Sequence, residues 1–119
     1  MMALRVQTQI SGDVFILRCE GRIVFGDECA VLRERTVNTL PGTPKVVVNL
    51  NDVDYIDSGG LGILVGLFVS ATNRGGEIKL VLPRKRVKYV LRRTNLDKIF
   101  NLYENDNEAV AAFGKQQVA

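Results

Sequence analysis

The sequence has 119 residues, of which 46% are hydrophobic and 24% are charged, and this is the composition of one ordinary globular domain. Its apolar runs are shorter than the ~20 residues of a membrane span and no export signal precedes them, so we expect a cytoplasmic protein with no membrane span. Because acidic and basic residues are mixed, with a net charge of +3, and because histidine is absent, we expect no nucleic acid partner, no enzyme, no metal and no cofactor.

The chain opens with the pattern of a β-hairpin. Apolar and polar residues alternate from Leu4 to Ile10, residues 11–13 (Ser-Gly-Asp) supply a turn, and an extended apolar run follows from Val14 to Cys19. Cys19 and Cys29 are expected to be reduced and partly buried, because a chain with its own core and no export signal does not depend on a disulfide.

A helix and a central strand are predicted next. Asp27 can cap a helix whose apolar residues recur at spacings of three and four up to Leu40, before a stretch rich in Pro and Gly at 41–44 ends the pattern. The run Lys45–Leu50 is rich in β-branched residues and does not alternate, which is typical of a strand covered on both faces.

Helices and strands alternate in the second half of the chain. A second helix follows the Asp-Ser-Gly-Gly sequence at 57–60 and closes at Gly75-Gly76. The later elements are a strand at 78–82, a basic third helix at 84–93, a short strand at 99–103 and a last helix that begins with a capping box of Asn105 and Glu108. We therefore predict an α/β domain with an opening hairpin and a mixed, mostly parallel sheet packed with about four helices.

Ser58 stands where the connection from a buried strand enters the second helix. Unpaired backbone N–H groups and the helix dipole make the local potential positive at such a position, which suits an oxygen. One interpretation is that Asp57 or Ser58 only caps the helix, which stabilises it by ~1 kcal/mol. The other interpretation is that Ser58 is a functional hydroxyl, and the residue types alone leave both open.

The second helix is apolar nearly all round. On a helical wheel, a stripe of small residues at Gly62, Gly66 and Ser70, flanked by Ile63 and Leu67, lies opposite the face that carries the larger side chains. Each interior glycine costs ~1 kcal/mol relative to alanine, so the gap is expected to serve a purpose. Either another helix of the domain or a partner protein covers the stripe. The predicted core face consists of Leu61, Leu64, Val65, Phe68 and Thr72.

Three stretches of the sequence form a specific combination: the apolar strand 46–50, the sequence Val-Asp-Tyr-Ile-Asp-Ser-Gly-Gly-Leu-Gly at 53–62, and Arg-Gly-Gly-Glu at 74–77. This combination resembles the bacterial anti-sigma factor antagonists of the STAS domain family, and the order of elements matches from about Leu4 to Phe113. The resemblance implies a single STAS-type domain over residues 1–119 with its core at about 4–113.

The resemblance also implies a phosphorylation switch. In this family the serine that follows the aspartate is phosphorylated by a kinase that is also the anti-sigma factor, and by position that serine is Ser58. The unmodified form would bind this anti-sigma factor, a serine kinase of the histidine-kinase-like ATPase type, and so release a sigma factor. Together with the small-residue stripe of the second helix and its flanking side chains, this gives the predicted partner-binding residues Val24, Asp27, Asp57, Ser58, Gly59, Gly62, Ile63, Gly66 and Leu67.

Two positions depart from the family pattern. Val24 stands where the family usually has an aspartate near the phosphorylation site, and Asp27 is the candidate to replace it. Gly59 stands where many members have a second Ser or Thr, so Ser58 offers a single hydroxyl. The first departure favours an alternative function, in which a STAS module that is never phosphorylated serves as a constitutive subunit of a lipid transporter or a stress-signalling complex.

Other interpretations have weaker support. The sequence around Ser58 resembles that of a protease nucleophile, but the chain has no histidine base. The glycines from Gly60 to Gly66 lack the spacing of a nucleotide loop, and the aspartates at 52–57 have the spacing of turn and capping residues rather than of a metal site. The basic third helix is expected to be a solvated outer face, and the alternative is a surface that binds anionic lipid, nucleic acid or an acidic protein.

Overall fold

The computed structural model of the chain describes residues 4–24, 26, 32, 45–81 and 84–115. Five strands, three helices with described bounds and one 3₁₀ turn lie in these residues. The strands are β1 (Arg5–Ser11), β2 (Val14–Ile23), β3 (Lys45–Ile56), β4 (Glu77–Val81) and β5 (Asn101–Tyr103). The helices are α2 (Ser58–Asn73), α3 (Lys85–Arg93) and α4 (Asp106–Lys115), and η1 (Leu96–Lys98) is the 3₁₀ turn.

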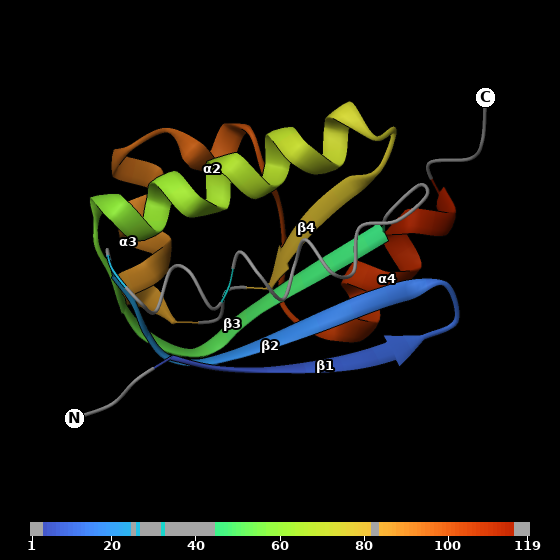
Figure 1. The fold of residues 1–119 in the computed structure, drawn as a ribbon, viewed down its shortest axis with the longest axis horizontal. Helices are drawn as coiled ribbons and strands as arrows, with labels where there is room; N and C mark the ends of the chain where they lie inside the picture. Colours follow the sequence, from blue (N-terminus) through green and yellow to red (C-terminus); the bar gives the residue numbers. More distant parts are fainter. Residues whose placement is uncertain (1–3, 25, 27–31, 33–44, 82–83, 116–119) are drawn as a thin grey trace.

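The five strands form one sheet in the order β1-β2-β3-β4-β5 (Figure 1). β1 and β2 are antiparallel and form the predicted hairpin, whose turn contains Gly12 with a φ of 62°. β2 and β3, β3 and β4, and β4 and β5 are parallel pairs. The predicted mixed, mostly parallel sheet is therefore confirmed.

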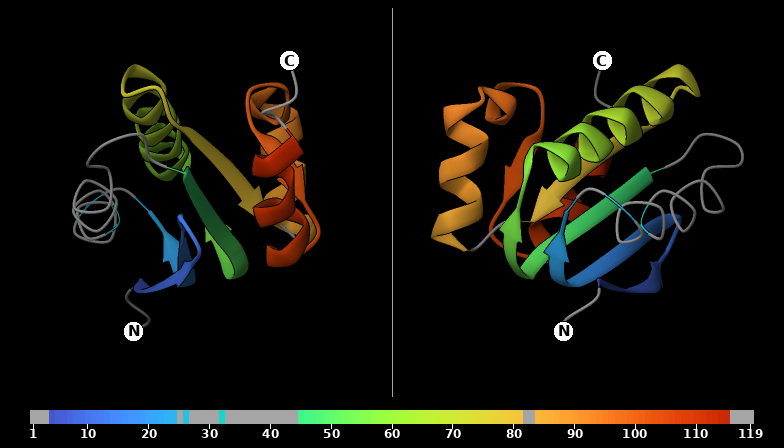
Figure 2. Two further views of the ribbon diagram at one scale, coloured as in Figure 1. Left: turned by 90° about the vertical axis from the view of Figure 1, so that its right-hand side faces the viewer. Right: turned by 60° about the vertical axis from the view of Figure 1, so that its left-hand side comes forward.

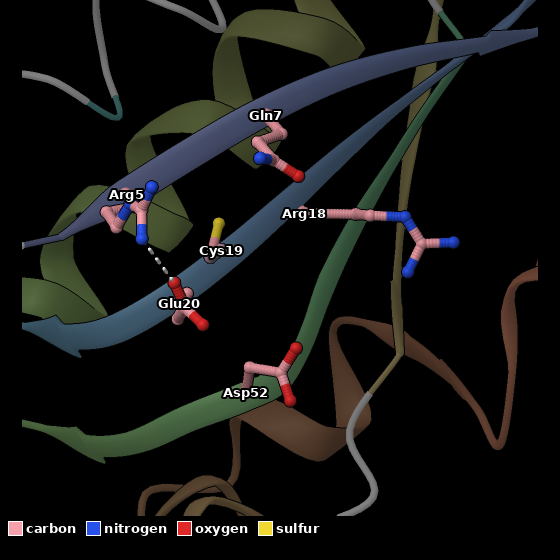
Figure 3. A pocket seen from close by; sticks show the side chains of 6 residues that line it. All are labelled: Arg5, Gln7, Arg18, Cys19, Glu20 and Asp52. Atoms are coloured by element: carbon pink, nitrogen blue, oxygen red, sulfur yellow. Dashed lines mark hydrogen bonds and ion pairs between the residues drawn. The ribbon is translucent and has the colours of Figure 1, made fainter.

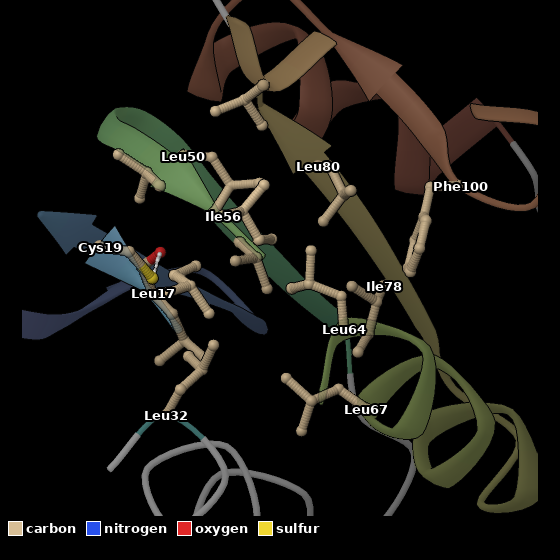
Figure 4. Close-up of a cluster of buried hydrophobic side chains, with 14 of the residues drawn as sticks. Leu17, Cys19, Leu32, Leu50, Ile56, Leu64, Leu67, Ile78, Leu80 and Phe100 are labelled. Carbon is tan, nitrogen blue, oxygen red and sulfur yellow. Dashed lines mark hydrogen bonds between the residues drawn. The ribbon is translucent and has the colours of Figure 1, made fainter. Parts of the chain in front are cut away.

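β3 lies in the middle of the sheet and is covered on both faces. Helices α2 and α4 lie on opposite sides of the sheet (Figure 2). Val46, Val48 and Leu50 belong to a large core with side chains of α2 and α3, in which Figure 4 labels Leu50, whereas Val47 belongs to a smaller core with side chains of α4. All four side chains are buried. A strand with two covered faces has no polar side to alternate with, which explains the unbroken apolar run in its sequence.

The smaller core contains a buried charge. Lys79 of β4 has no solvent exposure, and its Nζ lies 3.0 Å from Oε2 of Glu77. The same Nζ lies 4.8 Å from the ring centre of Phe113 and 5.4 Å from that of Tyr103. A carboxylate and two aromatic faces thus compensate for the lost hydration of the ammonium group, and they join β4 to β5 and α4.

The predicted count of about four helices is close to the structure. The second, third and fourth predicted helices correspond to α2, α3 and α4. The first predicted helix, from Asp27 to Leu40, lies outside the described residues except for Leu32, which is helical and buried in the large core. Cys29 also lies outside the described residues, whereas Cys19 is a buried free thiol.

Two details of the first and last strands differ from the pattern of the sequence. Ile10 continues the alternation of β1 but is 65% exposed, because it lies beyond the large core that buries Val6. The last strand contains only Asn101–Tyr103, because η1 comes before it and Phe100 turns into the large core. There its ring lies 5.5 Å from that of Phe68 in an edge-to-face arrangement.

Two helix ends have the predicted chemistry. After α2, Gly75 adopts a φ of 77° and the N–H of Gly76 donates to the carbonyl oxygen of Ala71 at 2.8 Å, which is a Schellman cap. Before α4, Oδ1 of Asn105 accepts a hydrogen bond of 2.9 Å from the N–H of Glu108, which is one half of the predicted capping box. The side chain of Glu108 accepts a hydrogen bond of 3.3 Å from the N–H of Glu104 rather than from that of Asn105. These ends fix where α2 and α4 stop and start.

The start of α2 meets the end of β2 at Gly60. A Cβ atom at Gly60 would lie 2.1 Å from the carbonyl oxygen of Ile23 and 2.8 Å from Cγ1 of Ile56, so only glycine fits. The same Ile23 carbonyl accepts a hydrogen bond of 3.3 Å from the N–H of Asp57. These contacts hold the first turn of α2 against the last residues of β2 and β3.

Gly60→Ala is expected to destabilise the domain by about 2–4 kcal/mol, because a backbone carbonyl cannot move aside as a flexible side chain would. Gly66→Ala is the matched control in the same helix, since no described atom lies within 4 Å of its Cβ position. This control should stabilise the domain by about 0.5–1 kcal/mol, because alanine favours the helix. Urea unfolding measures the difference, and equal midpoints would contradict the close contact at Gly60.

Cys19 is expected to be unreactive in the folded protein, because burial raises the pKa of its thiol to about 12. In a Cys29→Ser variant, iodoacetamide at pH 8 should label Cys19 only after unfolding, which mass spectrometry detects. Since the folded pKa lies above the unfolded value of about 9, the contribution of this thiol to stability is full below about pH 9 and is lost as the pH rises towards 12. Rapid labelling of the native variant would refute this burial.

Candidate functional site

Ser58 is the first residue of α2 and is exposed to solvent. The residue before it, Asp57, is the N-cap, because its Oδ1 accepts a hydrogen bond of 2.9 Å from the N–H of Gly60. Capping, which the sequence assigns to either Asp57 or Ser58, is thus performed by the aspartate. The hydroxyl of Ser58 stands at the surface at the positive end of the helix dipole.

The end of β2 brings Val24 close to the start of α2. The carbonyl of Ile23, directly before Val24, is bound to the N–H of Asp57. Val24 itself is half-buried and brings an apolar side chain to this junction. Asp27, the residue expected to replace a carboxylate there, lies outside the described residues.

The buried face of α2 differs from the predicted one. The side chains that α2 turns towards the sheet include Leu64, Leu67 and Ala71. Figure 4 labels Leu64 and Leu67, and Leu67 is only 4% exposed. The expectation that Leu67 flanks an exposed stripe is therefore wrong, as is the placement of the exposed Thr72 on the core face. The close contact at Gly60 sets this phase, because residues three, four and seven positions apart share one face of a helix.

The outward side of α2 is uncharged, and we call it the α2 surface. Gly62 and Gly66 are exposed, and no described atom lies within 4 Å of a Cβ atom placed at either. Nothing in the described part of the chain packs closely over these two glycines. Close packing against those residues therefore does not explain why glycine stands at 62 and 66. Residues 58–73 include no charged side chain. The α2 surface consists of Ser58, Gly59, Gly62, Ile63, Gly66 and Val69.

Two exposed apolar side chains in α2 or just before it were not among the predicted site residues. Val69 of α2 is 47% exposed, and Tyr55, three residues before Ser58, is 43% exposed. The correct helical phase identifies Val69, because it follows Gly62 and Gly66 at the spacing of one face. No pattern in the sequence distinguishes Tyr55 from the other residues at the end of β3.

A separate hollow of about 260 Å³ lies over β1, β2 and β3 (Figure 3). Nη1 of Arg5 lies 3.4 Å from Oε1 of Glu20, and Arg18 bonds to Gln9 and to Asp106. The cations of this hollow are therefore engaged in surface interactions and do not converge on a common point. Its lining consists of Arg5, Gln7, Arg18, Cys19, Glu20 and Asp52.

The described residues contain neither a group of side chains placed to bind a metal ion nor a helix that could span a membrane. Among them, no group of three His, Cys, Asp or Glu side chains is placed to hold a metal ion, and the aspartates at 52–57 form no such group. None of the helices in this part of the chain has the length and apolar character that crossing a bilayer requires.

Residues 5–109 match the STAS domain family. An anti-sigma factor antagonist homologue from Thermotoga neapolitana is 42% identical over 69 residues, which are 58% of this chain and 61% of that protein. The chain thus spans about three fifths of the length of this curated relative. The anti-sigma-B factor antagonist of Bacillus subtilis is 29% identical over 97 residues, which are 82% of this chain and 80% of that protein.

A solved structure shares this fold over nearly its whole length. The crystal structure of a candidate anti-sigma factor antagonist from Thermotoga maritima has a TM-score of 0.82 and 30% sequence identity, and the match covers 90% of this chain and 92% of that one. Because the family match extends over most of the sequence and the structural match over most of the fold, this chain belongs to the STAS domain family.

Proposed function

We propose that this chain is an anti-sigma factor antagonist that acts as a protein-binding switch at Ser58. In its unphosphorylated form it binds an anti-sigma factor, a serine kinase of the histidine-kinase-like ATPase type, and thereby releases a sigma factor. Phosphorylation of Ser58 by that kinase ends the binding. The chain itself acts by binding, in the cytoplasm, and takes no part in catalysis.

The exposure of Ser58 is the observation that carries the proposal. Because Asp57 caps α2, phosphorylation of the Ser58 hydroxyl by a kinase removes no capping hydrogen bond from the helix. The relatives reported above are all named as anti-sigma factor antagonists or their homologues, which supports the same class of partner for this chain.

The α2 surface gives the switch a physical basis. A partner that covers this uncharged surface removes water from around Ser58. A phosphate adds about −1.5 to −2 charges there, and an unpaired charge in a desolvated interface costs about 3 kcal/mol or more. That cost corresponds to a loss of affinity of about 100-fold or more.

Phosphorylation is expected to change binding rather than fold. The phosphate would lie at the positive end of the dipole of α2, where negative charge stabilises a helix. Ser58 is exposed, so the added group needs no space inside the core. The same domain can therefore exist in both states without rearranging its sheet.

The second candidate function is a constitutive STAS subunit of a lipid transporter or stress-signalling complex. Val24 favours it, because this half-buried apolar side chain stands near the start of α2 where the family pattern has a carboxylate. In this case the α2 surface would bind its partner permanently, and Ser58 would remain unmodified.

Ser58→Ala is expected to bind the cognate anti-sigma factor within about threefold of wild type, whereas Ser58→Asp should lose about 100-fold, because it places a charge in the interface. Asn107→Asp is the matched control, since it also puts a carboxylate at an exposed position in the first turn of a helix, but on α4 at the other face of the sheet. Isothermal titration calorimetry measures the three affinities.

These affinities, together with mass spectrometry of the chain after incubation with the kinase, distinguish the two candidate functions. If Ser58→Ala and Ser58→Asp bind with equal affinity, the charge mechanism is wrong. If wild type binds but mass spectrometry finds no phosphate on Ser58 after incubation with the kinase and ATP, the constitutive subunit is favoured.

Gly62→Ala is expected to stabilise the isolated domain by about 0.5–1 kcal/mol and yet to weaken partner binding, because the added methyl group opposes close approach to the α2 surface. Thr72→Ala is the control, as it also improves helix propensity at an exposed position of α2 but lies outside the α2 surface. Urea unfolding and calorimetric titration provide the two readouts. Unchanged binding by Gly62→Ala would remove the glycines from the proposed interface.

A further inference from the structure

Three consecutive cations, Arg84, Lys85 and Arg86, stand at the start of α3, and all are exposed. Arg84 is the N-cap and makes no side-chain cap hydrogen bond, and the first turn contains no acidic residue. The positive end of the helix dipole disfavours cations at this position. The stability of α3 therefore does not account for these three residues.

The remaining residues of α3 hold this cluster rigidly at the surface. Val87 and Leu91 are fully buried in the large core, so the helix cannot turn its cations inward. Lys88 forms an ion pair of 3.5 Å with Glu104. Lys85 and Arg86 form no ion pair among the described residues, which leaves their charges available to a visiting molecule.

The cluster borders an open hollow of about 390 Å³, whose lining also includes Asp54 of β3. Nε of Arg84 donates a hydrogen bond of 2.8 Å to the carbonyl oxygen of Asn51, which ties the start of α3 to β3. The hollow therefore lies between the start of α3 and the last part of β3, the segment that leads into Ser58.

The basic cluster and Ser58 lie on the same edge of the sheet. β3 and β4 are parallel neighbours, and α2 and α3 follow their carboxyl ends (Figures 1 and 2). The two helices consequently begin on the same side of the domain. A protein that covers an interface of ordinary size, about 800 Å² on each partner, reaches across both starts.

We propose that Arg84, Lys85 and Arg86, which we call the basic edge, dock an acidic segment of the protein that covers Ser58. This inference rests on the proposed function and adds the chemistry of its partner, namely Asp and Glu side chains beside an uncharged contact. The α2 surface has no charge with which to attract the partner. The basic edge supplies that attraction and so governs the rate of encounter.

An acidic protein segment fits the basic edge better than a membrane does. A helix that lies in a bilayer surface needs an outward apolar face, but α3 turns Val87 and Leu91 into the core and presents Tyr89 as its one large exposed apolar side chain.

The test compares two double variants of α3 that each lose two positive charges. Lys85→Gln/Arg86→Gln removes them from the basic edge, and Arg92→Gln/Arg93→Gln removes them from the last turn, about 10 Å along the helix. Stopped-flow association with the purified cognate anti-sigma factor is measured at low and at moderate ionic strength. Thermal unfolding of both variants verifies that each is folded.

The variant at the basic edge is expected to associate about tenfold more slowly at low salt and to show a weaker dependence on salt, with a dissociation rate within about twofold of wild type. The control variant should lose less than the basic-edge variant at low salt and should associate within about twofold of wild type at moderate ionic strength, where charges about 10 Å away are screened. Equal association rates for the two variants would overturn this inference and leave the switch at Ser58 standing.

Two further outcomes are distinguishable. A wild-type chain that does not bind the anti-sigma factor would overturn both the proposed function and this inference. Binding of wild type, but not of the variant at the basic edge, to mixed phosphatidylcholine and phosphatidylglycerol vesicles would assign the basic edge to lipid and overturn the inference of an acidic protein segment.

Discussion

The contact between Gly60 and the carbonyl of Ile23 is the constraint on which the geometry of the site depends. Because that carbonyl also accepts the N–H of Asp57, one backbone group fixes both where α2 begins and which way it faces. Leu64 is then directed at the sheet, Asp57 is left to cap the helix, and Ser58 faces solvent. The exposed serine is thus a consequence of how β2 and α2 meet.

The inward sides of α2 and α3 contribute stability, and their outward sides carry the residues of the proposed interface. The inward sides of α2 and α3 bury leucine and valine side chains, as packing requires. Their outward sides carry residues that oppose stability, namely the exposed glycines at 62 and 66 and the cations at 84–86. Natural proteins depart from local rules of stability chiefly at functional sites, so two such departures on one edge support a common purpose.

Some features could be predicted from the sequence because their causes are local. The unbroken apolar run of β3 shows that both faces are covered, and Gly75 and Asn105 mark helix ends through their own chemistry. The buried face of α2 could not be predicted, because the helix is apolar nearly all round and a helical wheel therefore does not show which side faces the core. The burial of Lys79 could not be predicted either, since it depends on Phe113, which is distant in the chain.

The buried ammonium of Lys79 also defines the register of α4. A helix held by apolar contacts alone can slide along a sheet at little cost, but a shift of one turn would take Phe113 off the ammonium and leave only Glu77 and Tyr103 to compensate for its buried charge. At the opposite end of α4, Asp106 bonds to Arg18 and, at 2.7 Å, to Asn49. The helix is therefore anchored at both ends, by Asp106 to β2 and β3 and by Phe113 to β4, so its position on the sheet does not depend on apolar contacts alone.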